Sequence, residues 1–193
     1  MTRGLSTHSR YLHRLISYHE AGHAVVARKL GVEIASVDMT PDDDRLANVW
    51  TPNITWLVEQ TGGDRAALVR GLYTDLMVAL AGMAAQELAG YRKNDDDCIG
   101  DINNAICYAM HLACVEAGLP LQSDSDELQE FTPYDPRHMA GVAIVERAGA
   151  EILAMLQDNW QAIERVAGAL RKYDRLTQAD LDRAIGHCQR RRQ

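Results

Sequence analysis

The sequence predicts a mainly α-helical fold with a small β-hairpin after the first helix and a bundle of helices at the C-terminal end. Three observations indicate this class. Apolar residues recur at helical spacing over most of the 193 residues, glycines follow these periodic segments, and the chain holds only 5 Pro and 1 Phe. Hydrophobic residues make up 47% and charged residues 24%, which is typical of a globular protein rather than a disordered or fibrous one.

The first helix is expected over residues 9–30, because apolar residues and two histidines share one side of it and Gly31 follows. Segments 33–39 and 46–50 have β character, and the turn residues between them predict a hairpin. Later helices are expected at 61–89, 101–117, 136–157 and 159–172, and a last one from Thr177. Their expected boundary residues are the stops Gly90 and Gly118, the N-caps Asp135 and Asp158, and a capping box at Thr177 and Asp180.

One domain is expected over residues 1–193, with an N-terminal extension at 1–9, an exposed acidic loop at 119–137 and a basic tail at 189–193. The net charge of −7 excludes nucleic acid as a main partner, because phosphate binding needs a basic face. The longest apolar run, 76–85, is too short to span a membrane, and the N-terminus lacks a secretory signal. Four cysteines without a CxxC pair favour a cytoplasmic location.

The residues that carry chemistry are His19, Glu20 and His23. Residues four apart lie on the same face of a helix, so both imidazoles can bind one metal ion, while Glu20 points beside that face. A bound metal lowers the pKa of a water, and Glu20 can take its proton and pass it to a leaving amine. Ala21 and Gly22 are expected to keep the helix slim where a substrate approaches. A catalytic zinc site needs a third protein ligand, and periodicity does not choose among the carboxylates.

The block 17–26, SYHEAGHAVV, resembles the AYHEAGHA block of the FtsH family of ATP-dependent zinc proteases. The segments VDMTP at 37–41 and LAGMAAQEL at 80–88 also resemble that family, and so do Gly100-Asp101-Ile102 and the closing helices. The resemblance runs from about Arg10 to Ile185. It implies a helical, zincin-like metallopeptidase domain that cleaves proteins or peptides with Zn²⁺ bound by His19, His23 and Asp101 and with Glu20 as the catalytic base.

The position of Asp101 at the start of a helix suits a carboxylate, and Asp95, Asp96 and Asp97 are its nearest rivals. The sequence departs from the family pattern at Ala81-Gly82-Met83 and Gln86-Glu87, where the family has Gly-Gly-Arg and Glu-Glu. Glu87 is a candidate for supporting a ligand histidine, or else an ordinary surface residue. The strand at 46–50 is either an edge for a substrate peptide or a structural hairpin.

No GxxxxGK[ST] motif occurs in the 193 residues, so the resemblance covers the peptidase domain and not the ATPase module of the family. The expected substrate is therefore a flexible or unfolded chain, unless a separate ATPase partner supplies one. Two alternatives stay open: a metal-binding regulatory or adaptor protein without turnover, and a peptidase dedicated to one regulatory protein. Assembly into a homo-oligomer is also left open by the sequence. His111, Cys107 and Cys114 are expected to have no role at the metal.

Overall fold

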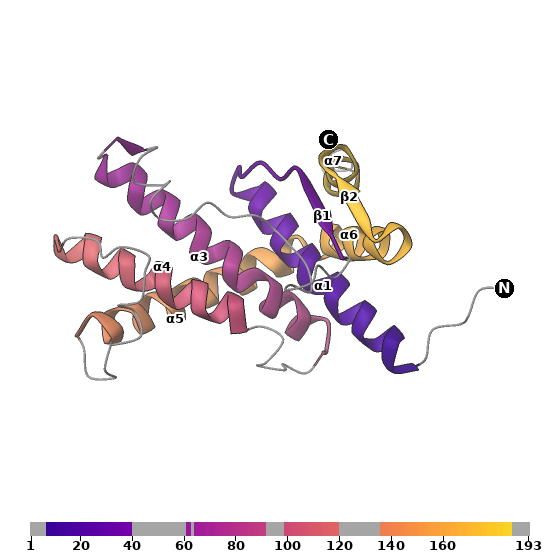
Figure 1. Cartoon of the computed structure of the whole chain (residues 1–193), viewed down its shortest axis with the longest axis horizontal. Helices are drawn as coiled ribbons and strands as arrows, with labels where there is room; N and C mark the ends of the chain where they lie inside the picture. The colour runs from indigo at the N-terminus through magenta and orange to yellow at the C-terminus, as the bar shows by residue number, and fades with distance from the viewer. Residues whose placement is uncertain (1–6, 40–60, 63, 92–98, 120–135, 187–193) are drawn as a thin grey trace. The chain divides into compact units, whose positions relative to one another are not determined.

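The computed structural model describes residues 7–39, 61–62, 64–91, 99–119 and 136–186, and within them the fold is mainly α-helical (Figure 1). The described residues form six helices and one sheet of two antiparallel strands, which confirms the predicted fold class. The elements in chain order are α1 Thr7–Lys29, β1 Ser36–Asp38, α3 Arg65–Leu88, α4 Ile99–Ala117, α5 Pro136–Asp158, α6 Trp160–Tyr173, β2 Arg175–Thr177 and α7 Gln178–Gly186.

The chain divides into two compact units. The first unit contains Met1–Trp50, Ala81–Lys93 and Ala154–Gln193, and the second contains Thr51–Leu80 and Asn94–Leu153. Helix α1, the last turns of α3, helices α6 and α7 and both strands thus belong to the first unit. Most of α3, all of α4 and most of α5 belong to the second.

Helix α1 is the central element of the first unit. Every residue from Glu20 to Ala27 is buried, so this part of the helix is covered on all sides rather than on one stripe. Helix α6 packs against α1 and contributes its apolar side, which is Ala162, Ile163, Val166, Ala167 and Leu170. Polar contacts secure α1 at its edges: Arg171 donates a hydrogen bond to the Ser17 hydroxyl, and Arg28 pairs with Asp182 of α7.

Gly22 packs directly against the end of α3. A methyl group added at Gly22 would lie 2.5 Å from the carbonyl oxygen of Ala81 and 2.7 Å from Cβ of Ala85. Both distances are far inside van der Waals contact, so the two backbones approach as closely as they do only because residue 22 has no side chain. The sequence-based expectation that Gly22 makes room for a substrate is therefore wrong, because the room is filled by α3.

The two strands of the sheet are far apart in the sequence, although both belong to the first unit. Strand β1 pairs with β2 in antiparallel register, with Val37 opposite Leu176, and both of these side chains are buried. The strand predicted at 33–39 thus forms at Ser36–Asp38, while its predicted partner at 46–50 lies outside the described residues. Strand β2 was missed because Leu176 and Thr177 read equally well as the entrance of the last helix.

Most predicted helix boundaries are confirmed. The backbone N–H and the hydroxyl of Thr177 both donate to the carboxylate of Asp180, which confirms the capping box. Gly31, Gly90 and Gly118 have positive φ, as expected of residues that end helices. One cap is wrong: Asp158 is the last residue of α5, and the N-cap of α6 is Asn159. Asp135 and most of the acidic loop lie outside the described residues.

In the second unit, α3 begins after Asp64, whose side chain accepts hydrogen bonds from the N–H groups of Ala66 and Ala67. Arg65 donates to the carbonyl oxygens of Val115 and Glu116 in the last turn of α4, and the Val115 oxygen also accepts from the N–H of Gly118. The apolar side chains of Leu68, Leu72, Leu76 and Leu80 on α3 are buried. One acidic residue, Asp75, is buried in the same stretch and is only 5% exposed.

Helix α3 is also long and apolar enough to cross a membrane by length and composition. The buried share of its most apolar window is 56%, and the core helix of a soluble protein has the same properties. The absence of a membrane span therefore stays a prediction, as does the cytoplasmic location.

We predict that Gly22→Ala destabilises the protein by about 1–3 kcal/mol, because the atom nearest to the new methyl group is the backbone carbonyl oxygen of Ala81, which cannot rotate away. Chemical denaturation measures this change. Gly168→Ala in α6 is the matched control, since its new methyl group meets only the end of Arg171 at 3.8 Å. The control is expected to be neutral or stabilising by up to about 1 kcal/mol. Equal stability of the two variants would contradict the close approach at Gly22.

We also predict that Asp75 makes the stability depend on pH. Burial raises the pKa of Asp75 from 3.8 to about 7, because the ionised carboxylate loses its hydration. The stability contributed by the neutral form is fully present below pH 4 and is lost as the pH rises through about 7. Asp75→Asn should thus stabilise the protein at pH 8 by up to about 4 kcal/mol and have little effect near pH 4.

Urea denaturation of wild type and Asp75→Asn at both pH values measures this difference, and groups common to both proteins cancel. Glu146→Gln, an exposed carboxylate on α5, is the control and should change stability by less than about 0.5 kcal/mol at either pH. If Asp75→Asn raises the free energy of unfolding equally at pH 4 and pH 8, the prediction is wrong.

Candidate metal centre

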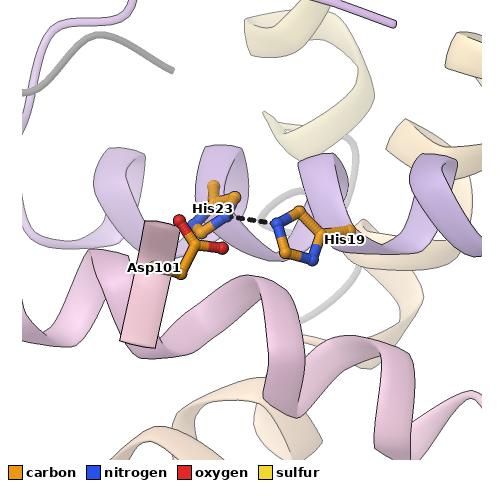
Figure 2. Close-up of side chains that lie close together, drawn as sticks. All are labelled: His19, His23 and Asp101. Carbon is orange, nitrogen blue, oxygen red and sulfur yellow. Dashed lines mark hydrogen bonds between the residues drawn. The ribbon is translucent and has the colours of Figure 1, made fainter. Parts of the chain in front are cut away.

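His19 and His23 lie one helical turn apart on α1, and their rings face each other. The two Nε2 atoms are 2.9 Å apart, the ring centroids are 4.6 Å apart, and the ring planes cross at 78° (Figure 2). His23 is 5% exposed, and the His19 side chain is 12% exposed. The expectation that both imidazoles lie on the apolar side of this helix is confirmed, and one nitrogen of each ring points to a shared point.

Glu20 lies beside this pair and is itself buried, with 4% of its surface exposed. Its Oε1 atom is 4.0 Å from Nε2 of His19. This separation is longer than a direct hydrogen bond and short enough for one small molecule to contact both groups. Glu20, which directly follows His19, thus places its carboxylate beside the histidine pair, as the i, i+1, i+4 spacing predicts.

The last turns of α3 form the surface against which the two rings lie. A methyl group added at Gly82 would lie 2.7 Å from both Cε1 and Nε2 of His19, and closer still to Nε2 of His23. Gly82 is therefore part of the site, although in the sequence it stands out only within Ala81-Gly82-Met83, where the family pattern differs. A glycine inside a helix, where it costs about 1 kcal/mol relative to alanine, was the available signal.

Asp101 is in the first turn of α4, where the helix N-terminus favours a carboxylate. His19, His23 and Asp101 together are a group of residues that could hold a metal ion. Asp101 belongs to the second unit, and its assignment as the third ligand is a proposal.

The histidine pair fits a divalent metal such as zinc. Imidazole nitrogens bind Zn²⁺ at about 2.0–2.1 Å, and two such ligands at a tetrahedral angle are roughly 3.4 Å apart. The observed 2.9 Å separation needs only a small rotation of either ring to reach that value. Two imidazoles and one carboxylate also match the ligand sets of catalytic zinc sites, which leave a fourth position for water.

The other candidates from the sequence differ in burial, and some of them are not described by the structure. Glu87 is exposed, which leaves the surface interpretation for this residue. His111 is 2% exposed and is a core residue of the second unit, and Cys114 is buried. Cys107 is half-buried. Asp95, Asp96 and Asp97 and the strand proposed at 46–50 lie outside the described residues.

Comparison with known proteins adds no assignment. No model of a known protein family matches the chain, and no curated protein matches it significantly. The site is therefore defined by its own residues and by the resemblance of its motifs.

We predict that the purified protein binds one Zn²⁺ or Co²⁺ per chain and that bound metal raises its melting temperature. Metal at 100 times the dissociation constant stabilises the folded state by about 2.7 kcal/mol. His23→Ala should abolish this shift, because it removes one of the paired nitrogens, whereas the exposed His8→Ala on the same helix should leave it unchanged. Isothermal titration and thermal melts measure both effects. Equal metal binding by wild type and His23→Ala would contradict the site.

Proposed function

We propose that the protein is a zinc-dependent metallo-endopeptidase that hydrolyses flexible or unfolded polypeptides. The observation that carries this proposal is the pairing of the His19 and His23 nitrogens at 2.9 Å with the buried carboxylate of Glu20 beside them. Two of the proposed metal ligands and the proposed proton acceptor thus come from a single segment of α1. The resemblance of the first motif to the FtsH peptidase supports the same reaction class.

The residues have separate roles in this proposal. His19, His23 and Asp101 would hold the metal, which when bound supplies a Lewis acid that acidifies water and polarises a carbonyl group. Glu20 accepts a proton from the attacking water as the new C–O bond forms. It then donates that proton to the amine nitrogen as the C–N bond breaks. Burial keeps the carboxylate of Glu20 away from bulk water, so the proton is passed within the site.

The ligand set favours zinc among the divalent metals, although imidazole and carboxylate groups also bind others. The substrate class follows from the absence of a GxxxxGK[ST] motif in the 193 residues, which leaves no ATP-driven unfolding within them. A folded substrate would need a separate ATPase. A cytoplasmic location, the absence of nucleic-acid binding and assembly into a homo-oligomer are predictions of the sequence that accompany this proposal.

We predict that Glu20→Gln keeps the metal and loses hydrolysis. The amide has the same shape as the carboxylate but cannot accept the proton, so cleavage of casein or a peptide library should fall by about 100- to 10,000-fold. Zinc content by mass spectrometry should stay at the wild-type value, since Glu20 is not a ligand in the proposed site. Glu164→Gln, an exposed glutamate on α6, is the matched control and should cleave as the wild type does.

Asp101→Asn in the same assays tests the third ligand. It should lose zinc affinity by more than the roughly 10- to 100-fold seen when only an outer residue of a zinc site is lost. If the wild type binds zinc but shows no cleavage beyond that of Glu20→Gln, the peptidase proposal is wrong. That result would support the metal-binding adaptor instead. Unchanged affinity in Asp101→Asn would remove Asp101 from the ligand set and leave the histidine pair in place.

A further inference from the structure

Gly82 occupies a position on α3 where helix stability alone would favour another residue. It is buried and lies inside α3, which continues to Leu88. Its backbone does not have positive φ, so its conformation is open to any amino acid. Glycine at this position is therefore explained by its neighbours, which occupy the volume that a side chain would need.

The histidine rings fill that space. All three of the nearest atoms to a methyl group at position 82 belong to the imidazoles of His19 and His23. The methyl carbon would be 2.7 Å from Nε2 of His19 and closer to Nε2 of His23, whereas zinc binds such nitrogens at about 2.0–2.1 Å. A side chain at position 82 would thus compete with the paired nitrogens, and with anything held between them, for one small volume.

The contrast with Gly22 shows why the effect should be specific to the site. At Gly22 the obstructing atom is a backbone carbonyl oxygen, which cannot move without shifting α3. At Gly82 the obstructing atoms are the ends of two side chains, which can rotate about their χ angles. A methyl group at position 82 can therefore be accommodated by the fold if the two rings leave their paired arrangement.

We propose that Gly82 is a positioning residue for the metal ligands: the absence of a side chain at position 82 permits the paired arrangement of His19 and His23. This inference rests on the proposed metal centre for its functional meaning, while its geometry rests on the first unit alone. Glycine is then required at position 82 for metal affinity and not for folding. Any larger residue separates the two Nε2 atoms and leaves the helices in place.

Metal titration of Gly82→Ala, next to wild type and the control Gly168→Ala, tests the proposal. We expect the affinity of Gly82→Ala for Co²⁺ and Zn²⁺ to fall at least about 100-fold, with loss of the visible absorption of bound Co²⁺. Its melting temperature without metal should stay within about 4 °C of the wild type or rise, because alanine is the better helix former. Gly168→Ala should match the wild type in affinity.

A second measurement makes the outcome independent of metal binding. Nuclear magnetic resonance of ¹⁵N-labelled histidine rings in the metal-free protein should show shifts for His19 and His23 in Gly82→Ala, with the signals of His13 and His111 unchanged. A wild type that binds no metal would end the proposed function, and the ring signals would still decide the role of Gly82. Unchanged ring signals, unchanged affinity, or an unfolded Gly82→Ala variant would each overturn the inference.

Discussion

The close approach of two helix backbones at Gly22 is the constraint on which the first unit depends. The carbonyl oxygen of Ala81 and the methyl group of Ala85 lie where a side chain at position 22 would be. One turn of α3 is thereby held against the one turn of α1 that carries Glu20 and both histidines. With bulkier residues at this crossing, the helices would separate and the rings would lose the surface against which they lie.

The same crossing explains why the chemistry lies on a buried part of a helix. Residues 20–27 of α1 are all buried, and most of them are alanine or valine. A histidine and a glutamate in this setting are removed from water, which strengthens their electrostatic interactions with each other and with a bound cation. The small alanine and valine side chains allow close packing around the site. The polar residues are confined to one side of a single turn.

Much of this arrangement could be predicted from the sequence, since local patterns determine helices and their ends. The boundaries of α1, α4 and α5 lie within two residues of those expected, and the Thr177 capping box forms as its spacing predicts. The i, i+4 spacing of His19 and His23 likewise requires only a helix. Features that depend on contacts distant in sequence were missed. Strand β2 exists because β1 pairs with it from 139 residues away, and nothing local marks it.

Gly82 is a similar case, because its reason lies in a neighbouring helix. From the sequence, it is one glycine in an apolar helix, and the motif analysis could only compare it with a family pattern. Gly22 was recognised but given the wrong role, since the sequence does not show which element faces it. The assignment of Asp101 needed a resemblance, because no periodicity relates a residue on α4 to two residues on α1.

The burial of Glu20 also bears on the choice between an active peptidase and a metal-binding adaptor without catalytic activity. An ionisable carboxylate that is 4% exposed costs stability unless its surroundings compensate it, and an apolar residue would suit the alanine- and valine-rich turn better. A protein that used only the metal would need His19 and His23 but not a buried acid between them. A glutamate at this position is the group that the proposed proton transfer needs, whereas the adaptor alternative gives it no role.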